Sequence, residues 1–354
     1  IRRPPRSTQG VSSAASDVYK RQIIKSTVVP GTTIQTIKPM LEGNSFQEST
    51  DFNLLTNPEF LREGSAIKDT KNPHVIVVGG NNVKSRKKLV EFYKKIYPKN
   101  QNYVETNTTT AEMIKYANNA FLATKISFVN ELSTLCEKTG ADIHAVAKGM
   151  GLDDRIGKKF LHVGPGFGGS CFRKDILHLS YLCEYYGLPE VADYWESVIR
   201  INEWQTDRFF QSILQEQFNT LAGKTITLLG FAFKQDTGDT RDSPAIPVCE
   251  KLLAEHACVR IHDPKALENA RQDLKEMQGD ISFVEDVYEA ADCAHALALV
   301  TQWKEYRELD FERIFQAMAK PAFIFDGRNH LDHKKLYEIG FNVFPLGKMP
   351  MKHI

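Results

Sequence analysis

The sequence predicts an α/β protein in which two α/β regions flank one long helix. Short apolar segments alternate with helical stretches over residues 23–107 and again over residues 221–354, and this alternation is typical of parallel sheets covered by helices. Residues 108–139, which lie between these regions, contain neither proline nor glycine and therefore predict a single helix. A chain of 354 residues has room for two or three domains.

The composition is that of a globular protein and gives no sign of nucleic-acid binding. Hydrophobic residues make up 42% and charged residues 25% of the chain, as is usual for globular domains. Residues 1–22 hold five basic and one acidic residue, so the rest of the chain carries −3 of the total charge of +1, and no basic surface is expected. Six cysteines without C-x-x-C spacing argue against a disulfide framework or a metal site and indicate a reducing, cytoplasmic compartment. No apolar run reaches membrane-spanning length, and the start lacks the apolar core of a signal peptide.

Residues 1–22 are expected to be disordered and to lie outside the fold. They are rich in Arg, Pro and Ser without usable periodicity, and such a segment cannot bury enough apolar surface to become ordered. They are also similar to a translated sequencing adapter joined to a reading frame, so we expect this segment to be non-native. A genuine basic tail is the alternative.

The first α/β region predicts a parallel sheet. Its expected elements are a strand over 22–29, a helix over 32–42, strands over 52–55 and 74–78, a basic amphipathic helix over 83–96 and a strand over 103–106. Alternation of short strands and helices favours parallel pairing. The region is shorter than the roughly 100–150 residues that are typical of a domain.

The remaining elements follow from the same patterns. The helix over 108–139 is apolar over most of its circumference, so it needs neighbours on several sides, which suggests packing against a second subunit. A second helical stretch over 172–210 is interrupted near Gly187 and Pro189. From residue 223, strands over 225–229, 259–262, 294–300 and 323–325 and a helix over 244–255 predict a second α/β unit, whose ligands should lie at the carboxyl ends of the strands. Lys234 and Arg241 follow the first of these strands and suit phosphate.

The most informative segment is the glycine-rich loop GPGFGGSCFRKD at residues 164–175. Four glycines allow the backbone to approach a ligand closely, and Cys171 directly precedes a predicted helix, whose N–H groups and dipole favour negative charge. Arg173 and Lys174 also favour the thiolate, the reactive form of cysteine. Asp175 follows Cys171 by one turn on the same face. These residues suggest a nucleophile with a neighbouring carboxylate, whereas the other five cysteines are expected to be small buried hydrophobic residues, which is also the alternative for Cys171.

This loop resembles the active-site loop of the UDP-glucose/GDP-mannose dehydrogenase family, whose members oxidise an alcohol to a carboxylate through an enzyme-bound thioester. The other matching segments are KSTVVPG at 25–31, NPEFLREGSAIKD at 57–69, GFAFKQDTGDTRDSP at 230–244 and FDGRN at 325–329. The resemblance implies a partial N-terminal Rossmann domain over 23–107, which is the remainder of an NAD-binding domain. It also implies a central helical dimerisation domain over 108–220 and a C-terminal Rossmann-like domain over 221–354 that binds the UDP-sugar. Because no strand–G-x-G-x-x-G–helix unit precedes residue 23, we expect the part of the domain that holds the cofactor pyrophosphate to be missing.

Two pairs of residues spaced by four suggest chemistry, although each could equally be a solvated surface pair. They are Glu59 with Glu63, expected on one helical turn, and Lys115 with Asn119. The resemblance implies that Glu59 assists hydrolysis of the thioester and that Lys115 stabilises oxyanion charge. By the same resemblance, Asn119 holds a sugar hydroxyl and a water. Thr27 is implied to position the water that shares proton transfer with Asp175.

The resemblance also implies two sets of binding residues. Arg155 would reach the substrate of a partner subunit, and some relatives carry lysine at the position of His162. The implied substrate-binding residues are Glu59, Phe60, Leu61, Glu63, Lys115, Asn119, Arg155, Phe160, His162, Gly164, Gly166, Phe167, Gly168, Phe233, Lys234 and Arg328. The implied cofactor-binding residues are Ser26, Thr27, Val28, Glu63, Cys171, Lys174 and Arg241.

The function that the resemblance implies is the oxidation of UDP-glucose to UDP-glucuronate with two NAD, in a homodimer or higher homo-oligomer formed through the central helix. Another nucleotide-sugar dehydrogenase, acting on GDP-mannose or a UDP-N-acetyl sugar, would share the cysteine loop and the Lys115–Asn119 helix. The segments NPEFLREG and FDGRN favour UDP-glucose. A non-catalytic nucleotide-sugar-binding fragment is the other alternative, because without a pyrophosphate loop the chain would bind NAD poorly.

Overall fold

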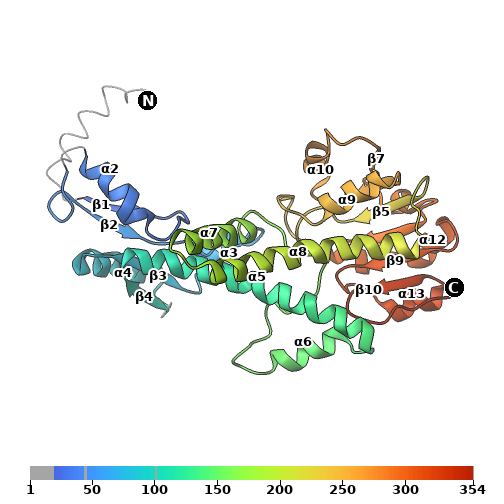
Figure 1. The fold of residues 1–354 in the computed structure, drawn as a ribbon, viewed down its shortest axis with the longest axis horizontal. Coiled ribbons are helices and arrows are strands. Elements are labelled where there is room, and N and C mark those ends of the chain that lie inside the picture. The colour runs from blue at the N-terminus through green and yellow to red at the C-terminus, as the bar shows by residue number, and fades with distance from the viewer. Residues whose placement is uncertain (1–19, 44–45, 100–101, 354) are drawn as a thin grey trace. The chain divides into compact units, whose positions relative to one another are not determined.

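A computed structural model describes residues 20–43, 46–99 and 102–353 (Figure 1). The chain forms two compact units that divide between Asn118 and Asn119. Residues 1–19 of the segment that we expect to be disordered lie outside the described residues. The domain boundaries expected after residues 107 and 220 stay predictions. No helix in the described ranges is both long enough and apolar enough to span a bilayer.

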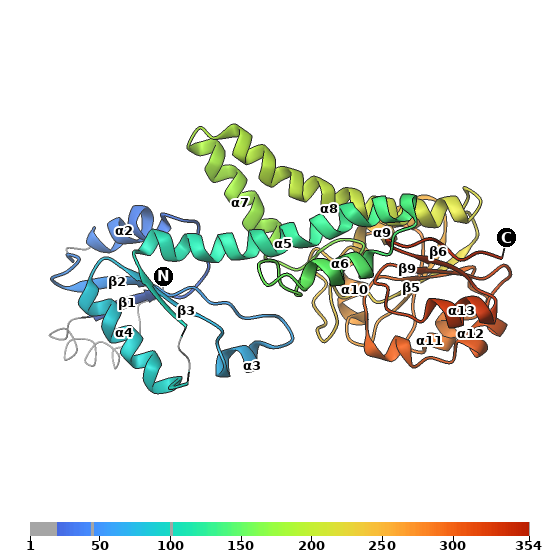
Figure 2. The same cartoon turned by 90° about the horizontal axis from the view of Figure 1, so that it is seen from below.

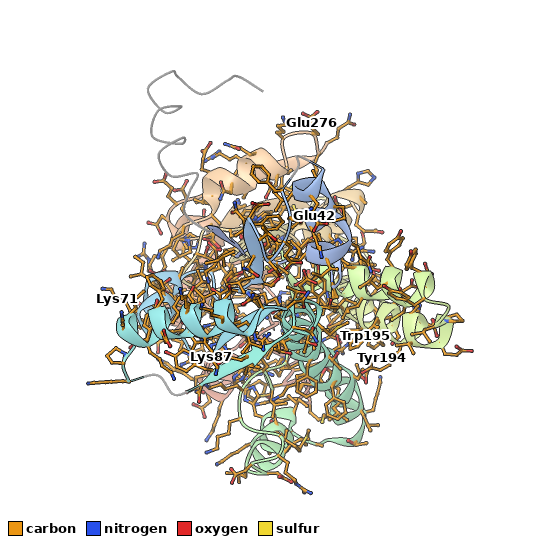
Figure 3. The ribbon with its side chains drawn as sticks, turned by 90° about the vertical axis from the view of Figure 1, so that its left-hand side faces the viewer. Glu42, Lys71, Lys87, Tyr194, Trp195 and Glu276 are labelled. Carbon is orange, nitrogen blue, oxygen red and sulfur yellow. The ribbon has the colours of Figure 1, made fainter. Side chains whose placement is uncertain are left out.

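The first unit contains a four-stranded sheet in the order β1-β2-β3-β4. Its elements are β1 (Lys20–Ile24), the π-helix η1 (Thr33–Ile37), α2 (Lys38–Glu42), β2 (Phe52–Thr56), α3 (Ala66–Lys71), β3 (Ile76–Gly80), α4 (Val83–Ile96) and β4 (Tyr103–Thr106), followed by the start of α5 (Thr108–Thr139). In the core of this unit, buried side chains of β2 and β3 pack against Leu89 and Val90 of α4. The opposite side of α4 is basic, and Lys87 points outward from it (Figure 3).

Two expectations for this sheet were wrong. Strand β1 begins at Lys20, so residues 20–22 belong to the fold, where they pair with residues 52–54 of β2. It ends at Ile24 rather than at residue 29, because the paired chain passes into Asn57 and Pro58, and proline has no N–H to continue a ladder. In addition, β3 runs antiparallel to β2, whereas β1–β2 and β3–β4 are parallel. A parallel return usually needs a crossover helix that packs on the sheet, and the connection from β2 to β3 contains only the short helix α3.

The second unit begins with three helices after α5, namely α6 (Ile143–Gly151), α7 (Phe172–Tyr185) and α8 (Pro189–Glu216). The break expected near Gly187 and Pro189 is confirmed. Gly187 takes a positive φ of 71°, which glycine adopts at little cost, and Pro189 opens α8 at its first position, where a missing N–H is harmless. Helices α7 and α8 therefore form a hairpin, which extends away from the C-terminal sheet (Figure 2).

The C-terminal part of the second unit is a six-stranded sheet in the order β10-β9-β8-β5-β6-β7, with parallel pairing throughout, as expected. The elements are β5 (Thr225–Leu229), α9 (Ala245–Ala254), β6 (Cys258–His262), α10 (Leu267–Asp273), β7 (Asp280–Phe283), α11 (Val287–Ala291), β8 (Ala296–Leu299), the 3₁₀ helix η2 (Lys304–Arg307), α12 (Phe311–Ala317), β9 (Phe323–Asp326), α13 (His333–Ile339) and β10 (Asn342–Pro345).

The two faces of this sheet are buried by different helices. On β5, Ile226 and Leu228 belong to the core that also contains side chains of α5, α8 and α9. Leu229 faces the opposite core, which includes side chains of α11, α12 and α13. This alternation follows from the two-residue period of a strand. Both faces of the sheet are covered by helices, so a ligand can reach it only at the ends of the strands.

Candidate active site

Cys171 lies at the N-cap of α7, where the sequence predicts it, and its side chain is exposed. Its carbonyl oxygen accepts the first helical hydrogen bond, from the N–H of Asp175 at 2.9 Å. The Ser170 hydroxyl oxygen lies 3.7 Å from the Cys171 sulfur. Free N–H groups at a helix N-terminus stabilise nearby negative charge, so this position suits a nucleophilic thiol.

Asp175 supplies a carboxylate one turn beyond the cysteine. It is 1% exposed, and its Oδ2 accepts a 2.7 Å hydrogen bond from Nδ2 of Asn119. Its Oδ1 lies 3.3 Å from Nζ of Lys174. The structure therefore brings together three of the predicted site residues, Asn119, Lys174 and Asp175, beside the exposed thiol.

The loop before the cysteine is buried and is held by side chains that the sequence analysis missed. Oδ1 of Asn130 accepts from Gly164 N–H at 2.9 Å, and Nε2 of Gln205 donates to Gly164 C=O at 2.9 Å. Thr206 Oγ1 donates to Pro165 C=O at 2.6 Å, and the Asn202 amide bonds both backbone groups of Phe167. The spacing of Asn202, Gln205 and Thr206 on one face of α8 was the available signal, because residues three and four apart share a helix face.

The loop also packs closely against the C-terminal domain. A Cβ on Gly168 would overlap the carbonyl of Asp242, and one on Gly169 would overlap the ring of Phe233. Gly169 takes a φ of 86° and donates its N–H to Arg241 C=O at 2.8 Å. Glycine is therefore required for space at both positions, and at Gly169 for conformation as well. Predicted substrate residue Phe233 lies directly against the loop as a result.

Aromatic contacts connect other predicted residues of the loop to α7. The ring of Phe167 meets that of Phe172 edge to face at 5.7 Å, and the ring of Phe160 lies 6.4 Å from the ring of Phe172. Phe160 has a φ of 63°, an uncommon conformation for a non-glycine residue. Gly166, at a φ of 135°, packs against the Thr206 hydroxyl. These contacts fix the approach of the chain to Cys171.

Arg328 is a largely buried cation beside this loop. Its Nε donates to Val300 C=O at 2.6 Å, its backbone N–H donates to Asp326 at 3.0 Å, and its Nη1 lies where a Cβ of Gly164 would be. Burial lowers the pKa of Arg328 to about 10, which still leaves it charged at neutral pH. Asp326 is fully buried and also accepts from the N–H groups of His330 and Leu331, so it fixes the turn that carries Arg328.

A cavity of about 690 Å³ opens beside Arg328. Among the described residues, its lining includes eight basic or potentially basic side chains and no acidic one, together with Gln235, Gln302, Asn329 and apolar side chains. The basic residues are His144, Lys148, Lys158, His162, Lys304, Arg307, Arg328 and His330. Burial lowers the pKa of His144 and His330, so the positive charge comes mainly from the lysines and arginines. Cations gathered around a hollow favour an anionic ligand. His162, a predicted substrate residue, is exposed at this cavity.

Three predicted cations at the surface of this unit have local partners. Arg155 forms a two-pronged ion pair with Asp153, and Arg241 forms one with Asp239. The Nζ of Lys234 lies 5.3 Å from the centre of the Phe233 ring. An arginine in such a pair keeps its charge but has to exchange this partner when it binds a ligand.

The first unit brings together Glu59, Phe60 and Lys115. Lys115 is 5% exposed. Its Nζ lies 3.7 Å from Oε1 of Glu59 and 5.1 Å from the centre of the Phe60 ring. Asn119 follows Lys115 by one turn of α5. The buried ammonium therefore has a carboxylate partner of the predicted site.

The expectation that Glu59 and Glu63 share a helical turn was wrong. Both lie in irregular chain before α3, which begins at Ala66. Pro58 lies just before this stretch, and Oε2 of Glu59 accepts from the N–H of Leu61 at 2.6 Å, which replaces a helical bond with a side-chain turn. Leu61 and Glu63 are exposed. The other predicted residues, Ser26, Thr27 and Val28, lie in the coil after β1.

Comparison with known proteins assigns three segments of the chain to one family. The description "UDP-glucose/GDP-mannose dehydrogenase family" matches three times, as NAD binding domain at residues 9–97, as central domain at 109–204 and as UDP binding domain at 227–333. The chain is 46% identical to UDP-glucose 6-dehydrogenase 1 of Arabidopsis thaliana, over 94% of this chain and 74% of that one. The chain belongs to the UDP-glucose/GDP-mannose dehydrogenase family.

Solved structures of this family have the same fold. A UDP-glucose dehydrogenase from Pyrobaculum islandicum superposes with a TM-score of 0.80 at 32% identity, over 97% of this chain and 76% of that one. An NDP-N-acetyl-D-galactosaminuronic acid dehydrogenase from Methanosarcina mazei gives 0.79 at 26% identity, over 92% and 69%. UDP-glucose 6-dehydrogenase 1 of Oryza sativa subsp. japonica is 45% identical over 95% of this chain and 74% of its own length. The expected α/β class with two Rossmann-like domains and a long central helix is confirmed.

Proposed function

We propose that the protein oxidises UDP-glucose to UDP-glucuronate in two NAD-dependent steps, with Cys171 as the covalent nucleophile. The observation that carries the proposal is the exposed Cys171 thiol at the N-terminus of α7, one turn from the buried Asp175 that Asn119 holds. The relatives at 45–46% identity are UDP-glucose 6-dehydrogenases, which favours UDP-glucose over other nucleotide sugars.

The residues divide the chemistry between them. Asp175 accepts the proton of the C6 hydroxyl through a water that Thr27 positions, and Cys171 then attacks the resulting aldehyde to form an S–C6 bond in a thiohemiacetal. Lys115 stabilises the negative charge that develops on the C6 oxygen. After the second oxidation, C6 is a thioester, and Glu59 assists the water that releases the carboxylate and returns the thiol.

The residues of the first unit fit a nicotinamide cofactor. Ser26 and Thr27 carry hydroxyl groups and follow β1 at the carboxyl edge that it shares with β2, where ligands of such sheets bind. We propose that Ser26, Thr27, Val28 and Glu63 hold the cofactor here, and that Cys171, Lys174 and Arg241 contact it as well. When bound, NAD accepts the hydride that each oxidation releases from C6.

The UDP group is assigned to the C-terminal half. Arg328, anchored by Val300 and Asp326, and Lys234 suit the diphosphate, and the acid-free cavity beside Arg328 adds further positive charge. His162 lines this cavity, and Phe233, which lies against Gly168 and Gly169, is proposed as a further substrate contact. The remaining substrate contacts are proposed for Phe60 and Leu61, for Phe160, and for the backbone of Gly164, Gly166, Phe167 and Gly168.

We also propose a homodimer formed through the central helices, in the cytoplasm. Phe121, Phe128 and Leu135 recur every seven residues along α5 and are 64%, 42% and 60% exposed, which is the pattern of an unpaired helix stripe. The α7–α8 hairpin also carries exposed aromatic residues, namely Tyr181, Tyr185, Tyr186 and Tyr194. In such a dimer Arg155 would reach the partner's substrate. All six cysteines are free thiols, in keeping with a reducing compartment.

The test replaces the nucleophile. We expect Cys171→Ser to reduce the formation of UDP-glucuronate by at least about a thousandfold, as for other removed nucleophiles, because a serine ester does not replace the thioester. Product is measured by mass spectrometry and NADH by absorbance, with two NADH per sugar in the unchanged enzyme. Cys293→Ser is the matched control. The expectation that all five other cysteines are buried was wrong for Cys293, which is exposed, whereas Cys136 and Cys249 are buried. Normal production of UDP-glucuronate by Cys171→Ser would refute the role of this residue.

A further inference from the structure

The backbone N–H and C=O of Gly164 are each bonded by a buried side chain that has no proposed chemical role. Asn130 of α5 and Gln205 of α8 are both 0% exposed. The first accepts from Gly164 N–H and the second donates to Gly164 C=O, each at 2.9 Å. One residue of the loop therefore has both its backbone groups fixed by amides from two different helices.

This arrangement has a cost that points to a specific requirement. Among the described residues, Nδ2 of Asn130 is buried without a hydrogen-bond partner, and an unpaired buried donor is unfavourable. An apolar side chain of similar shape would avoid this cost but would lose the bond to Gly164. The position of the Gly164 peptide is thus what the asparagine provides.

Gln205 is itself oriented by a partly buried charged group, Arg208. Its Oε1 accepts from Nε of Arg208 at 3.1 Å, and Arg208 pairs with Glu137 at 2.6 Å and donates to the Ser133 hydroxyl at 3.2 Å. Glu137 in turn accepts from Gly347 N–H at 2.6 Å. This chain of bonds fixes the amide of Gln205, so that its NH₂ group can only point at the loop.

The other side of Gly164 faces the proposed phosphate ligand. Nη1 of Arg328 occupies the space of the absent Cβ of Gly164, and Arg328 is tied to Val300 C=O at 2.6 Å. A shift of the Gly164 peptide would therefore change the space between the loop and the guanidinium. Displacements of about an ångström are enough to weaken a polar site of this kind.

We propose that Gln205 is a positioning residue for the nucleoside-diphosphate subsite, acting through Gly164 on the gap between the loop and Arg328. The inference rests on the proposed function, because it takes the diphosphate of the substrate as the ligand of Arg328. Gln205 touches neither the reacting carbon nor the thiol. Its removal therefore impairs nucleotide binding more than the reactivity of Cys171.

The test compares two variants of the full-length chain. Gln205→Met keeps the length of the side chain but removes both hydrogen bonds. Gln205→Glu keeps the acceptor for Arg208 and removes only the donor to Gly164. Gln215→Met, at an exposed position of the same helix, is the matched control. Binding of UDP alone is measured by calorimetry, KM for UDP-glucose and for NAD by steady-state kinetics, and folding by thermal unfolding.

We expect both Gln205 variants to bind UDP about tenfold more weakly or worse, the effect of one lost well-placed hydrogen bond. KM for UDP-glucose should rise in parallel, KM for NAD should stay within about twofold, and alkylation of Cys171 by iodoacetamide should keep its rate. UDP binding by Gln205→Glu at the strength of the unchanged protein would overturn the inference, because the Arg208 network alone would then suffice. Equal increases in both KM values would overturn it too. Failure of the unchanged protein to bind UDP would instead overturn the proposed function, and this inference with it.

Discussion

Asp175, the proposed general base, is a buried carboxylate with polar partners on both oxygens. The carboxylate is 1% exposed, and Asn119 donates to its Oδ2 while Lys174 lies near its Oδ1. A buried carboxylate needs polar partners to offset its lost hydration, and Asn119 and Lys174 supply them here. This burial and orientation support the proposed role of Asp175 as the general base.

Replacing this carboxylate tests its role directly. We expect Asp175→Asn to lower kcat by about 10²–10⁴-fold, the usual contribution of a positioned general base, with little change in KM for UDP-glucose. Steady-state kinetics measure both parameters. Asp193→Asn, an exposed aspartate of α8 that pairs only with Arg200 at the surface, should leave both unchanged. A kcat within about threefold of the unchanged enzyme would exclude Asp175 as the base.

For single residues, the sequence could predict those positions that neighbouring residues in the chain determine. The place of Cys171 at a helix N-terminus follows from the glycines before it and the helix pattern after it. Asn130, Gln205 and Thr206 could not be found in this way, because their partners in the loop are 34 to 41 residues away in the chain. The helical spacing of Gln205 and Thr206 with Asn202 places all three on one face of α8, but it does not show which distant segment that face contacts.

At the scale of elements, α5 is the part that the sequence predicts best. Its observed bounds, Thr108–Thr139, are those expected from the absence of proline and glycine, and Gly140 follows it with a φ of 79°. The direction of β3 could not be predicted, because an apolar run carries no information on whether its neighbour is parallel or antiparallel. The segment at Glu59 was wrongly expected to be helical, because four-residue spacing alone does not distinguish a helical turn from a turn closed by a side chain.

Helix α5 also holds an element of the first unit in place through Glu112. This carboxylate is 2% exposed and accepts from Gly31 N–H at 2.7 Å, from Thr33 N–H at 3.0 Å and from the Thr33 hydroxyl. The N-terminus of η1 has N–H groups that the helix itself cannot satisfy. Glu112 thus caps this helix from outside, over a separation of about 80 residues.

We expect Glu112→Leu to destabilise the first unit by roughly 2–4 kcal/mol, because it leaves buried donors at Gly31 and Thr33 without an acceptor. Urea denaturation gives the free energy of unfolding, and hydrogen exchange at the amides of Gly31 and Thr33 gives the local effect. Glu131→Leu, at an exposed position of the same helix, should change neither. Unchanged exchange at both amides would show that the capping contacts contribute nothing to stability.

At the scale of the whole molecule, two buried histidines of the second unit connect stability to pH. His262 and His330 are each 9% exposed. His262 shares a 2.9 Å hydrogen bond with the Tyr306 hydroxyl, and Nε2 of His330 donates to Trp303 C=O at 2.8 Å. Burial lowers the pKa of both imidazoles from the ordinary value of 6.5, since a charged ring would lose its hydration.

The sign of the pH dependence follows from these shifts. Below the ordinary value of 6.5, the unfolded chain takes up protons on both rings while the folded protein does not. The unfolded state then binds more protons, so the free energy of unfolding falls as the pH falls. The pKa of Asp326 is also lowered: burial raises it, but bonds from His333 and backbone N–H groups outweigh burial. Its contribution is lost only at more acidic pH, below the range in which the histidines act.

We therefore expect the urea midpoint of the second unit's transition to decrease steadily from about pH 7.5 to about pH 5.5, in the window set by the histidines. The transition is followed by the fluorescence of Trp303, whose C=O accepts from His330 and whose indole N–H donates to Asp263, the residue after His262. The other tryptophans are replaced by phenylalanine. His330→Gln keeps a donor for Trp303 C=O and removes the titration, so it should reduce the slope of midpoint against pH. His353→Gln, at an exposed histidine near the C-terminus, should leave the slope unchanged. A midpoint that is constant or rises towards acid would show that the two rings are protonated in the fold, which the burial of His262 and His330 argues against.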